Sequence, residues 1–313
     1  MTPPANRTIA FFVTPHGYGH ASRASAVMNA LGVRVPGLTI EIFTRVPLWF
    51  FNMSLRVNFH YHDVLTDIGL VQANSMVEDL PETIHKLEAF LPFRPALVED
   101  LAAQVHVAGC EMVICDIAPL GIAVAREAGL PSVLVENFTW DWIYSGYLAE
   151  EPRFAPYIDY LHGIFAAADT HVRTTPVCSE ELPASLTTNP VWREPRNTRA
   201  ETRARLGVPP QAPLVLVTMG GIVTEFPYLE RLQNSPEVRF LIPGGSDRYE
   251  QRGSLVLIPH HSDLYHPDLV QACDAVIGKL GYSTLAEAYS HGLPFGFVPR
   301  KRFRESLEMG KYA

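Results

Sequence analysis

Short apolar runs rich in β-branched and aromatic residues recur along the N-terminal half of the chain, and segments with helical periodicity separate them. Strands are predicted over residues 8–13, 38–43, 112–115 and 132–135, and helices over residues 21–31, 82–107 and 119–128. Strands that alternate with helices in this way are typical of βαβ units on a parallel sheet. We therefore expect a doubly wound α/β domain over residues 1–185.

The periodicity disappears over residues 186–211, which are rich in proline, arginine and threonine, so this stretch is interpreted as an interdomain linker. Further strands are predicted over residues 214–217, 238–242, 255–258, 275–277 and 295–298. The second domain is expected to be doubly wound as well and to cover residues 212–313. The predicted fold class is α/β, with two Rossmann-like domains facing a cleft.

Glycines and small polar residues follow three of the predicted strands. Ligands of open parallel sheets gather at the carboxyl ends of strands, so these positions are candidate binding residues. Glycine permits a tight turn and a close backbone approach, and the helix that follows offers free N–H groups to a phosphate. Each glycine could also serve only its own turn. The candidates are Gly17, Gly19, Gly220, Gly221, Lys279, Gly281, Ser283 and Thr284.

Three residues are candidates for proton transfer or for orienting a substrate. His20 stands where a helix is predicted to begin, and a neutral imidazole there can take a proton from an acceptor hydroxyl. Asp116 directly follows a predicted strand, and Asp141 lies in an aromatic segment over residues 137–144. Asp116 is expected to face the cleft, as are Glu136 and Asn137 after the next predicted strand, although each could instead cap a helix or form a turn. Asp141 could orient a sugar or a base.

Two charged residues in the second domain are candidates for donor binding. Glu287 lies about one turn inside the helix that Ser283 begins, where its carboxylate can accept hydrogen bonds from vicinal ribose hydroxyls. Arg300 opens a basic cluster after the last predicted strand and could offset the charge of a departing diphosphate. The alternative for both is a solvated surface position.

The amino-acid composition limits the classes of molecule that the protein is expected to bind. Lysine and arginine total 25 against 33 acidic residues, and the formal charge of −8 argues against nucleic acid and anionic lipid. The four cysteines have no C-x-x-C spacing, as expected for reduced thiols, and no run of about 18 apolar residues predicts a membrane span. We expect a cytoplasmic protein. The apolar segment 46–51 is interpreted as core or domain packing, with weak peripheral membrane contact as the alternative.

Several of these motifs resemble those of GT-B glycosyltransferases. They are GYGH ending at His20, Gly220–Gly221, GYSTLAE ending at Glu287, and the GLP that follows. The segments FTWDWIYSGY (138–147) and CDAVIGKLGYSTLAEAYSHGLPFGFVPRKRF (273–303) resemble the N-terminal, glycosyltransferase-like half of plant-type L-arabinokinases. A more distant resemblance is to the N-acetylglucosaminyltransferase that forms lipid II.

The resemblance implies transfer of a sugar from a nucleotide diphosphate donor, most commonly a UDP-sugar, to a small-molecule, glycan or lipid-linked acceptor. It also implies a metal-independent and inverting reaction, with His20 on the acceptor side and Glu287, six residues after Gly281, holding the ribose. No sugar-kinase phosphate loop occurs in the sequence, so a kinase is not expected. GT-B proteins usually continue beyond this last strand, so a truncated second domain is expected. The alternatives are a UDP-sugar 2-epimerase-like enzyme and a non-catalytic module that binds sugar or nucleotide.

Overall fold

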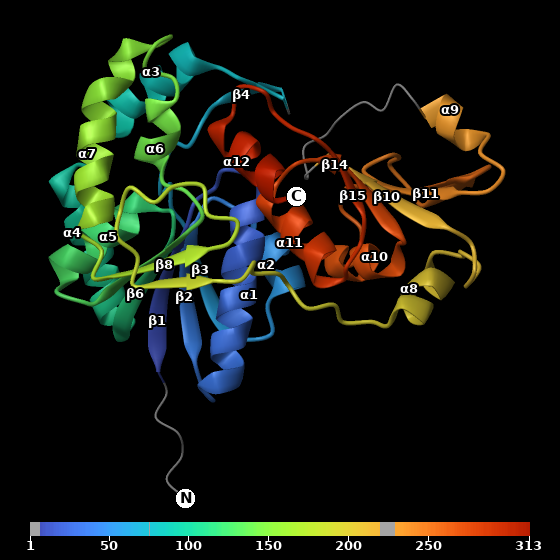
Figure 1. Cartoon of the computed structure of the whole chain (residues 1–313). Coiled ribbons are helices and arrows are strands. Elements are labelled where there is room, and N and C mark those ends of the chain that lie inside the picture. Colours follow the sequence, from blue (N-terminus) through green and yellow to red (C-terminus); the bar gives the residue numbers. More distant parts are fainter. Residues whose placement is uncertain (1–6, 75, 220–228) are drawn as a thin grey trace, which may run out of the picture. The chain divides into compact units, whose positions relative to one another are not determined.

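The computed structural model describes residues 7–74, 76–219 and 229–313, which form two compact units (Figure 1). Unit 1 comprises Met1–Val191 together with Lys301–Tyr312, and unit 2 comprises Trp192–Arg300. The chain therefore leaves unit 1 after Val191 and returns to it at Lys301.

Unit 1 is built on a seven-stranded, wholly parallel sheet with the order β3-β2-β1-β6-β7-β8-β9. The strands are β1 (Thr8–Val13), β2 (Thr39–Thr44), β3 (Asn58–Asp63), β6 (Cys110–Asp116), β7 (Ser132–Glu136), β8 (Thr170–Thr174) and β9 (Leu186–Thr188). A separate hairpin joins β4 (Gln72–Asn74) and β5 (Val77–Glu78). The chain order reverses between β1 and β6, and ligands of doubly wound sheets bind at such a reversal.

The helices of unit 1 are α1 (Tyr18–Arg34), α2 (Leu48–Ser54), α3 (Leu80–Phe90), α4 (Pro95–Val107), α5 (Pro119–Ala128), α6 (Trp140–Ser145), α7 (Ala155–Ala166) and the last helix, α12 (Arg304–Tyr312). A short 3₁₀ helix covers Pro152–Phe154. Helix α1 packs against α2, and α5 packs against both α4 and α7 (Figure 1). Apolar residues of β1, such as Phe11 and Val13, are fully buried in the core between sheet and helices.

Unit 2 is built on a six-stranded sheet with the order β12-β13-β11-β10-β14-β15, in which only the pairing of β12 with β13 is antiparallel. The strands are β10 (Leu214–Thr218), β11 (Arg239–Pro243), β12 (Glu250–Arg252), β13 (Leu255–Ile258), β14 (Ala275–Lys279) and β15 (Phe295–Val298). Its described helices are α8 (Arg199–Arg205), α9 (Leu229–Gln233), α10 (His266–Ala272) and α11 (Tyr282–Ser290). Here the chain order reverses between β10 and β14.

One predicted helix is wrong. The stretch 82–107 was expected to be a single helix, but the structure divides it into α3 and α4. Pro92 and Pro95 lie at the break, and proline in a helix interior removes a backbone hydrogen bond and clashes with the preceding turn. Pro95 instead opens α4, where its missing N–H costs nothing.

The apolar segment 46–51 belongs to the core of unit 1. Val46, Phe50 and Phe51 are buried there, while Leu48 is 43% exposed. None of the helices in residues 7–74, 76–219 and 229–313 has the length and apolar character needed to cross a bilayer. All four cysteines are free and buried, and burial raises the pKa of each thiol.

Candidate active site

The turn after β1 brings His20 to the point of unit 1 where the strand order reverses. Gly17 precedes α1 with a φ of 75°, a left-handed conformation that favours glycine, and no side chain caps the helix there. Gly19 and His20 follow in the first turn of α1. Val13, the last residue of β1, pairs with Asp116, the last residue of β6. The two neighbouring strand ends therefore place a histidine and an aspartate side by side.

Nδ1 of His20 lies 3.1 Å from Oδ1 of Asp116. His20 is 8% exposed and Asp116 is completely buried. An ionised carboxylate only accepts hydrogen bonds, so this contact puts the ring proton on Nδ1 and the lone pair on Nε2. Within the described part of the chain, Nε2 has no hydrogen-bond partner. The edge of the His20 ring meets Phe138, with ring centroids 5.6 Å apart.

Arg23 is the residue of this site that the sequence reasoning missed. It lies one helical turn after His20 and is 1% exposed. Its guanidinium donates from Nε to Oδ2 of Asp116 at 2.8 Å and from Nη2 to Oδ1 at 2.7 Å. Burial by itself raises the pKa of the Asp116 carboxyl, but Arg23 and His20 outweigh it and hold that pKa below its ordinary value. The i, i+3 spacing from His20 was the available signal.

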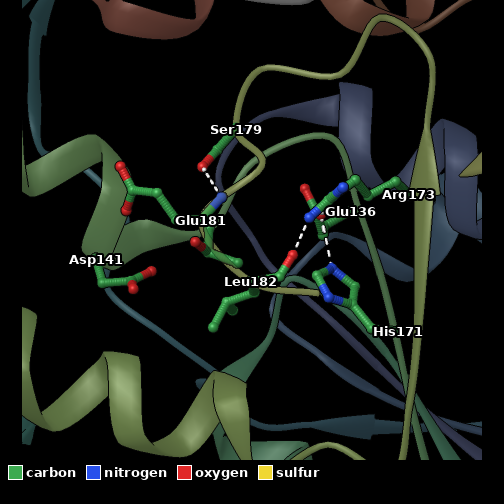
Figure 2. A pocket seen from close by; sticks show the side chains of 8 residues that line it. Glu136, Asp141, His171, Arg173, Ser179, Glu181 and Leu182 are labelled. Atoms are coloured by element: carbon green, nitrogen blue, oxygen red, sulfur yellow. Dashed lines mark hydrogen bonds and ion pairs between the residues drawn. The ribbon is translucent and has the colours of Figure 1, made fainter. Parts of the chain in front are cut away.

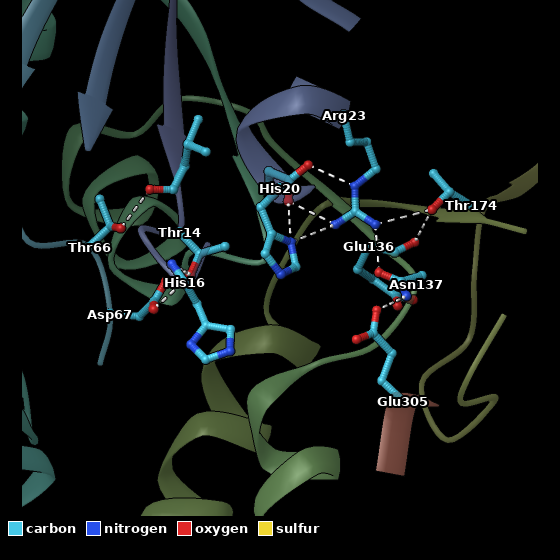
Figure 3. Close-up of polar contacts among 12 residues, drawn as sticks. Thr14, His16, His20, Arg23, Thr66, Asp67, Glu136, Asn137, Thr174 and Glu305 are labelled. Carbon is cyan, nitrogen blue, oxygen red and sulfur yellow. Dashed lines mark hydrogen bonds and ion pairs between the residues drawn. The ribbon is translucent and has the colours of Figure 1, made fainter. Parts of the chain in front are cut away.

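Asn137 and Glu305 extend the network from Arg23 to the last helix. Nη1 of Arg23 donates to Oδ1 of Asn137 at 2.6 Å and to Oγ1 of Thr174 at 3.3 Å. Nδ2 of Asn137 in turn donates to Oε1 of Glu305, the second residue of α12, at 3.0 Å (Figure 3). Phe303, which is 1% exposed, packs beside Phe138 and His16.

Two arginines of the basic cluster after the last strand form ion pairs and hydrogen bonds within unit 1. Arg302 donates to Glu150 at 2.6 Å and pairs with Glu78 at 3.2 Å. Arg304 donates to the carbonyl oxygen of Trp142 at 2.9 Å, and its guanidinium lies 4.1 Å from the centroid of that ring. Arg300, the candidate for diphosphate contact, is the last residue of unit 2 and is 5% exposed.

A second buried carboxyl lies beside the loop that follows β1. Oγ1 of Thr14 donates to Oδ1 of Asp67 at 2.8 Å (Figure 3), and Asp67 is 3% exposed. Burial raises the pKa of Asp67 to about 8. A carboxyl with such a pKa is largely protonated at neutral pH, so Asp67 differs in charge from Asp116.

Asp141 lies in α6 and takes part in a different cluster from His20. Its Oδ2 lies 2.9 Å from Nδ1 of His162. It also lines a pocket with about 230 Å³ of empty space that includes open solvent (Figure 2). In that pocket Glu136 lies 2.7 Å from Nε2 of His171 and 3.7 Å from Nε of Arg173. The other lining residues are Thr139, Ser179, Glu181 and Leu182. Of the three catalytic candidates, the structure brings together His20 and Asp116 only.

In unit 2, Gly281 and Ser283 lie at the reversal between β10 and β14. Gly281 immediately precedes α11, whose start has no side-chain cap, and Ser283 and Thr284 lie in its first turn. A Cβ at Gly281 would meet no heavy atom within 4 Å among the described residues. Gly278 differs, because a Cβ there would lie 1.9 Å from the carbonyl oxygen of Thr218. Lys279 ends β14. The candidates Gly220 and Gly221 lie outside the described residues.

Glu287 is buried inside unit 2, with an exposed fraction of 1%. Arg193 donates to its Oε1 from Nε at 3.2 Å and from Nη2 at 3.0 Å. Its Oε2 lies 2.8 Å from Nδ1 of His266. Burial raises the pKa of Glu287, but Arg193 and His266 lower it below its ordinary value. Ribose hydroxyls at Glu287 would have to share or replace these contacts.

A metal site was not expected from the sequence. Within residues 7–74, 76–219 and 229–313, no group of three or more histidine, cysteine, aspartate or glutamate side chains is arranged to hold a metal ion.

Comparison with known proteins gives one family over nearly the whole chain. Residues 7–309 match the family model described as Glycosyl transferase family 1. The chain is 29% identical over 304 residues to L-arabinokinase from Arabidopsis thaliana. The aligned region covers 95% of this chain and 28% of that protein. The chain thus spans little more than a quarter of the length of that relative.

Solved glycosyltransferases share the fold. Phytolacca americana UGT2, complexed with UDP-2fluoro-glucose and pterostilbene, superposes with a TM-score of 0.61 at 12% identity, covering 96% of this chain and 82% of that one. A UDP-glucosyltransferase from Polygonum tinctorium gives a TM-score of 0.63 at 14% identity, covering 98% and 83%. The predicted GT-B-like α/β fold and the resemblance to L-arabinokinases are confirmed. The protein belongs to glycosyl transferase family 1.

Proposed function

We propose that this protein transfers a sugar from a UDP-sugar donor to an acceptor hydroxyl, with His20 as the base. The observation that carries the proposal is the contact between His20 and Asp116 at the strand reversal of unit 1. It fixes the ring proton on Nδ1 and leaves Nε2 able to accept a proton. Asp116 acts as a positioning residue that orients the imidazole.

In the proposed reaction, Nε2 of His20 takes the proton of the acceptor hydroxyl as the hydroxyl oxygen attacks the anomeric carbon of the donor. The bond from that carbon to the diphosphate oxygen breaks, and its electron pair leaves with UDP. Attack from the side opposite the leaving group inverts the anomeric configuration. General base catalysis of this kind contributes roughly 10²–10⁴-fold to a rate.

We assign the nucleotide diphosphate to the start of α11 in unit 2. Free N–H groups at a helix N-terminus attract phosphate, and no side chain caps α11. The open space beside Gly281 supports a close approach of the ligand, and Lys279 supplies positive charge nearby. UDP or a UDP-sugar analogue is bound in two of the similar structures, which supports a uridine donor.

Nucleotide binding tests the donor site. A thermal-shift series with UDP, ADP, GDP and UDP-sugars is expected to show stabilisation by uridine nucleotides, by about 2.7 kcal/mol at a ligand concentration of 100 Kd. Lys279→Met should weaken binding by about 10–100-fold, the cost of a hydrogen bond to a charged group. Lys311→Met is the matched control, because Lys311 pairs with Glu308 in α12. The donor assignment fails if no nucleotide stabilises the protein.

Product analysis tests the reaction. Mass spectrometry of the protein with UDP-sugars and a panel of hydroxylated acceptors is expected to show a glycosylated acceptor and free UDP, and His20→Gln should abolish both products. Conversion of the donor sugar without an acceptor would indicate an epimerase instead. Tight nucleotide binding with no turnover under any condition would indicate a non-catalytic module.

A further inference from the structure

Asp116 is placed where a carboxyl does not ionise readily on its own. It is completely buried, and burial favours the neutral form of a carboxyl group. The guanidinium of Arg23 meets both carboxylate oxygens at 2.7 and 2.8 Å. This two-point geometry supplies the compensating positive charge and also fixes the plane of the carboxylate.

The charge state of Asp116 decides which ring nitrogen of His20 carries the proton. An ionised Asp116 can only accept, so Nδ1 is the donor across the 3.1 Å contact, which is shorter than the 3.4 Å between Nδ1 and Nη2 of Arg23. A protonated Asp116 could donate its own O–H to Nδ1, and the ring proton would then lie on Nε2. A histidine in that second tautomer cannot take a proton at Nε2.

The other charged groups around the site do not replace Arg23. Asp67 is itself a carboxyl group whose pKa the charge of Asp116 raises, so it supplies no positive charge to Asp116. Glu305 reaches the network through Asn137, whose Nδ2 donates a hydrogen bond to its carboxylate. That bond leaves Oδ1 of Asn137 to accept from Arg23, which anchors the guanidinium. On the remaining side, the His20 ring meets the apolar rings of Phe138 and Trp140.

We infer that Arg23 is a positioning residue that keeps Asp116 ionised, and thereby holds the proton of His20 on Nδ1 and keeps Nε2 available as a base. The inference deepens the proposed function and rests on it for the role of Nε2. Arg23 contacts neither donor nor acceptor in this scheme. The positive charge of Arg23, more than the shape of its side chain, is needed to keep the proton of His20 on Nδ1.

The ¹⁵N chemical shifts of His20 at neutral pH test the inference directly. The wild type and Arg23→Lys are expected to show the proton on Nδ1, because both keep a cation. Arg23→Gln and Asp116→Asn are expected to show it on Nε2. Arg153→Met is the control, because Arg153 pairs with Glu151 on the surface of unit 1. An Arg23→Gln variant with its proton still on Nδ1, or an Arg23→Lys variant with it on Nε2, would overturn the inference.

Folding and activity give two further readouts. If Arg23→Gln does not fold, the double variant with Asp116→Asn is expected to fold, because it no longer contains the unpaired buried carboxyl group. A double variant as unstable as Arg23→Gln alone would contradict the pairing of Arg23 with Asp116. If Arg23→Gln folds, its transfer rate should fall as far as that of Asp116→Asn, with unchanged affinity for UDP. The tautomer measurement needs no donor or acceptor, so it can succeed even if the protein binds no nucleotide, which would refute only the proposed function.

Discussion

His20 and Asp116 are separated by 96 positions in the sequence, yet Nδ1 of one lies 3.1 Å from Oδ1 of the other. They meet because β1 and β6 are neighbours in the sheet although four helices and four strands separate them along the chain. Asp116 is the last residue of β6, and His20 lies in the first turn of the helix that follows β1. The sheet topology, and not any local motif, therefore assembles the proposed base and its orienting carboxylate.

Asp116→Asn is expected to lower the rate of sugar transfer by roughly 10²–10⁴-fold, because an amide can donate to Nδ1 and favour the wrong tautomer of His20. Single-turnover kinetics with a UDP-sugar would measure the rate, and calorimetry the affinity for UDP, which should change less than about twofold. Asp159→Asn, an exposed substitution in α7, is the control. Equal losses in the two variants would show that Asp116 has no special role.

Asp67 should make the protein less stable as pH rises from about 4 to 8. Its pKa is about 8 in the folded state against 3.8 ordinarily, so the folded state binds the proton more tightly. The resulting stability is present in full below pH 4 and is lost as pH rises through 8. The slope reaches at most about 1.4 kcal/mol per pH unit.

Urea unfolding of the wild type and Asp67→Asn at pH 5.5, 7 and 8.5 would measure this contribution. The asparagine keeps an acceptor for Thr14 but cannot titrate, so the difference between the two proteins isolates Asp67 from the histidines. The wild type should lose more stability than the variant over this range. Parallel pH profiles would mean that Asp67 has an ordinary pKa.

Phe303→Ala should destabilise the protein by about 3–5 kcal/mol, the usual cost of removing a fully buried aromatic ring. Phe303 packs beside Phe138 and His16, so the loss falls on the contact between the C-terminal segment and the rest of unit 1. Leu307→Ala in α12 is the control, since Leu307 is 50% exposed and should change stability by no more than about 0.5 kcal/mol. Chemical denaturation compares them, and similar midpoints would contradict the buried packing of Phe303.

Arg193 and Glu287 should be strongly coupled in a double-mutant cycle. With Arg193→Met and Glu287→Gln we expect a coupling energy of about 1–3 kcal/mol, because each single change leaves a buried charge without its partner. The exposed pair Arg205 and Asp263 should give less than about 1 kcal/mol. Unfolding free energies of the four proteins in each cycle provide the test. Equal coupling in both cycles would rule out a special role for the buried pair.

The sequence predicted several strands well, because each is a continuous apolar run. The predicted ranges 8–13, 255–258 and 295–298 match β1, β13 and β15. Strand β3 was missed. Its sequence NFHYHD is polar at alternate positions and lies at the edge of the sheet, where its side chains are exposed or half-buried. Four of its six residues are polar, which leaves only a weak apolar signal.

The site was only partly predictable for a similar reason. His20 and Asp116 follow strands, and that position alone marks them as candidates. Arg23 lies inside a helix, where an arginine usually faces water, and its partner Asp116 is 93 positions away. The partners of Glu287 are likewise distant, with Arg193 94 positions earlier. Long-range pairing of buried charges depends on the folded topology, which local patterns do not contain.

The division of unit 1 into two stretches of chain has a consequence during synthesis. The first 191 residues emerge from the ribosome before Phe303 and Glu305, which cover Phe138 and accept from Asn137. Until all of unit 2 has been translated, Phe138 lacks the packing of Phe303, and Nδ2 of Asn137 lacks its hydrogen bond to Glu305. The native structure of unit 1 is therefore completed only after translation has passed Glu305. The packing around Phe138, which contacts the ring of His20, is among the last parts to form.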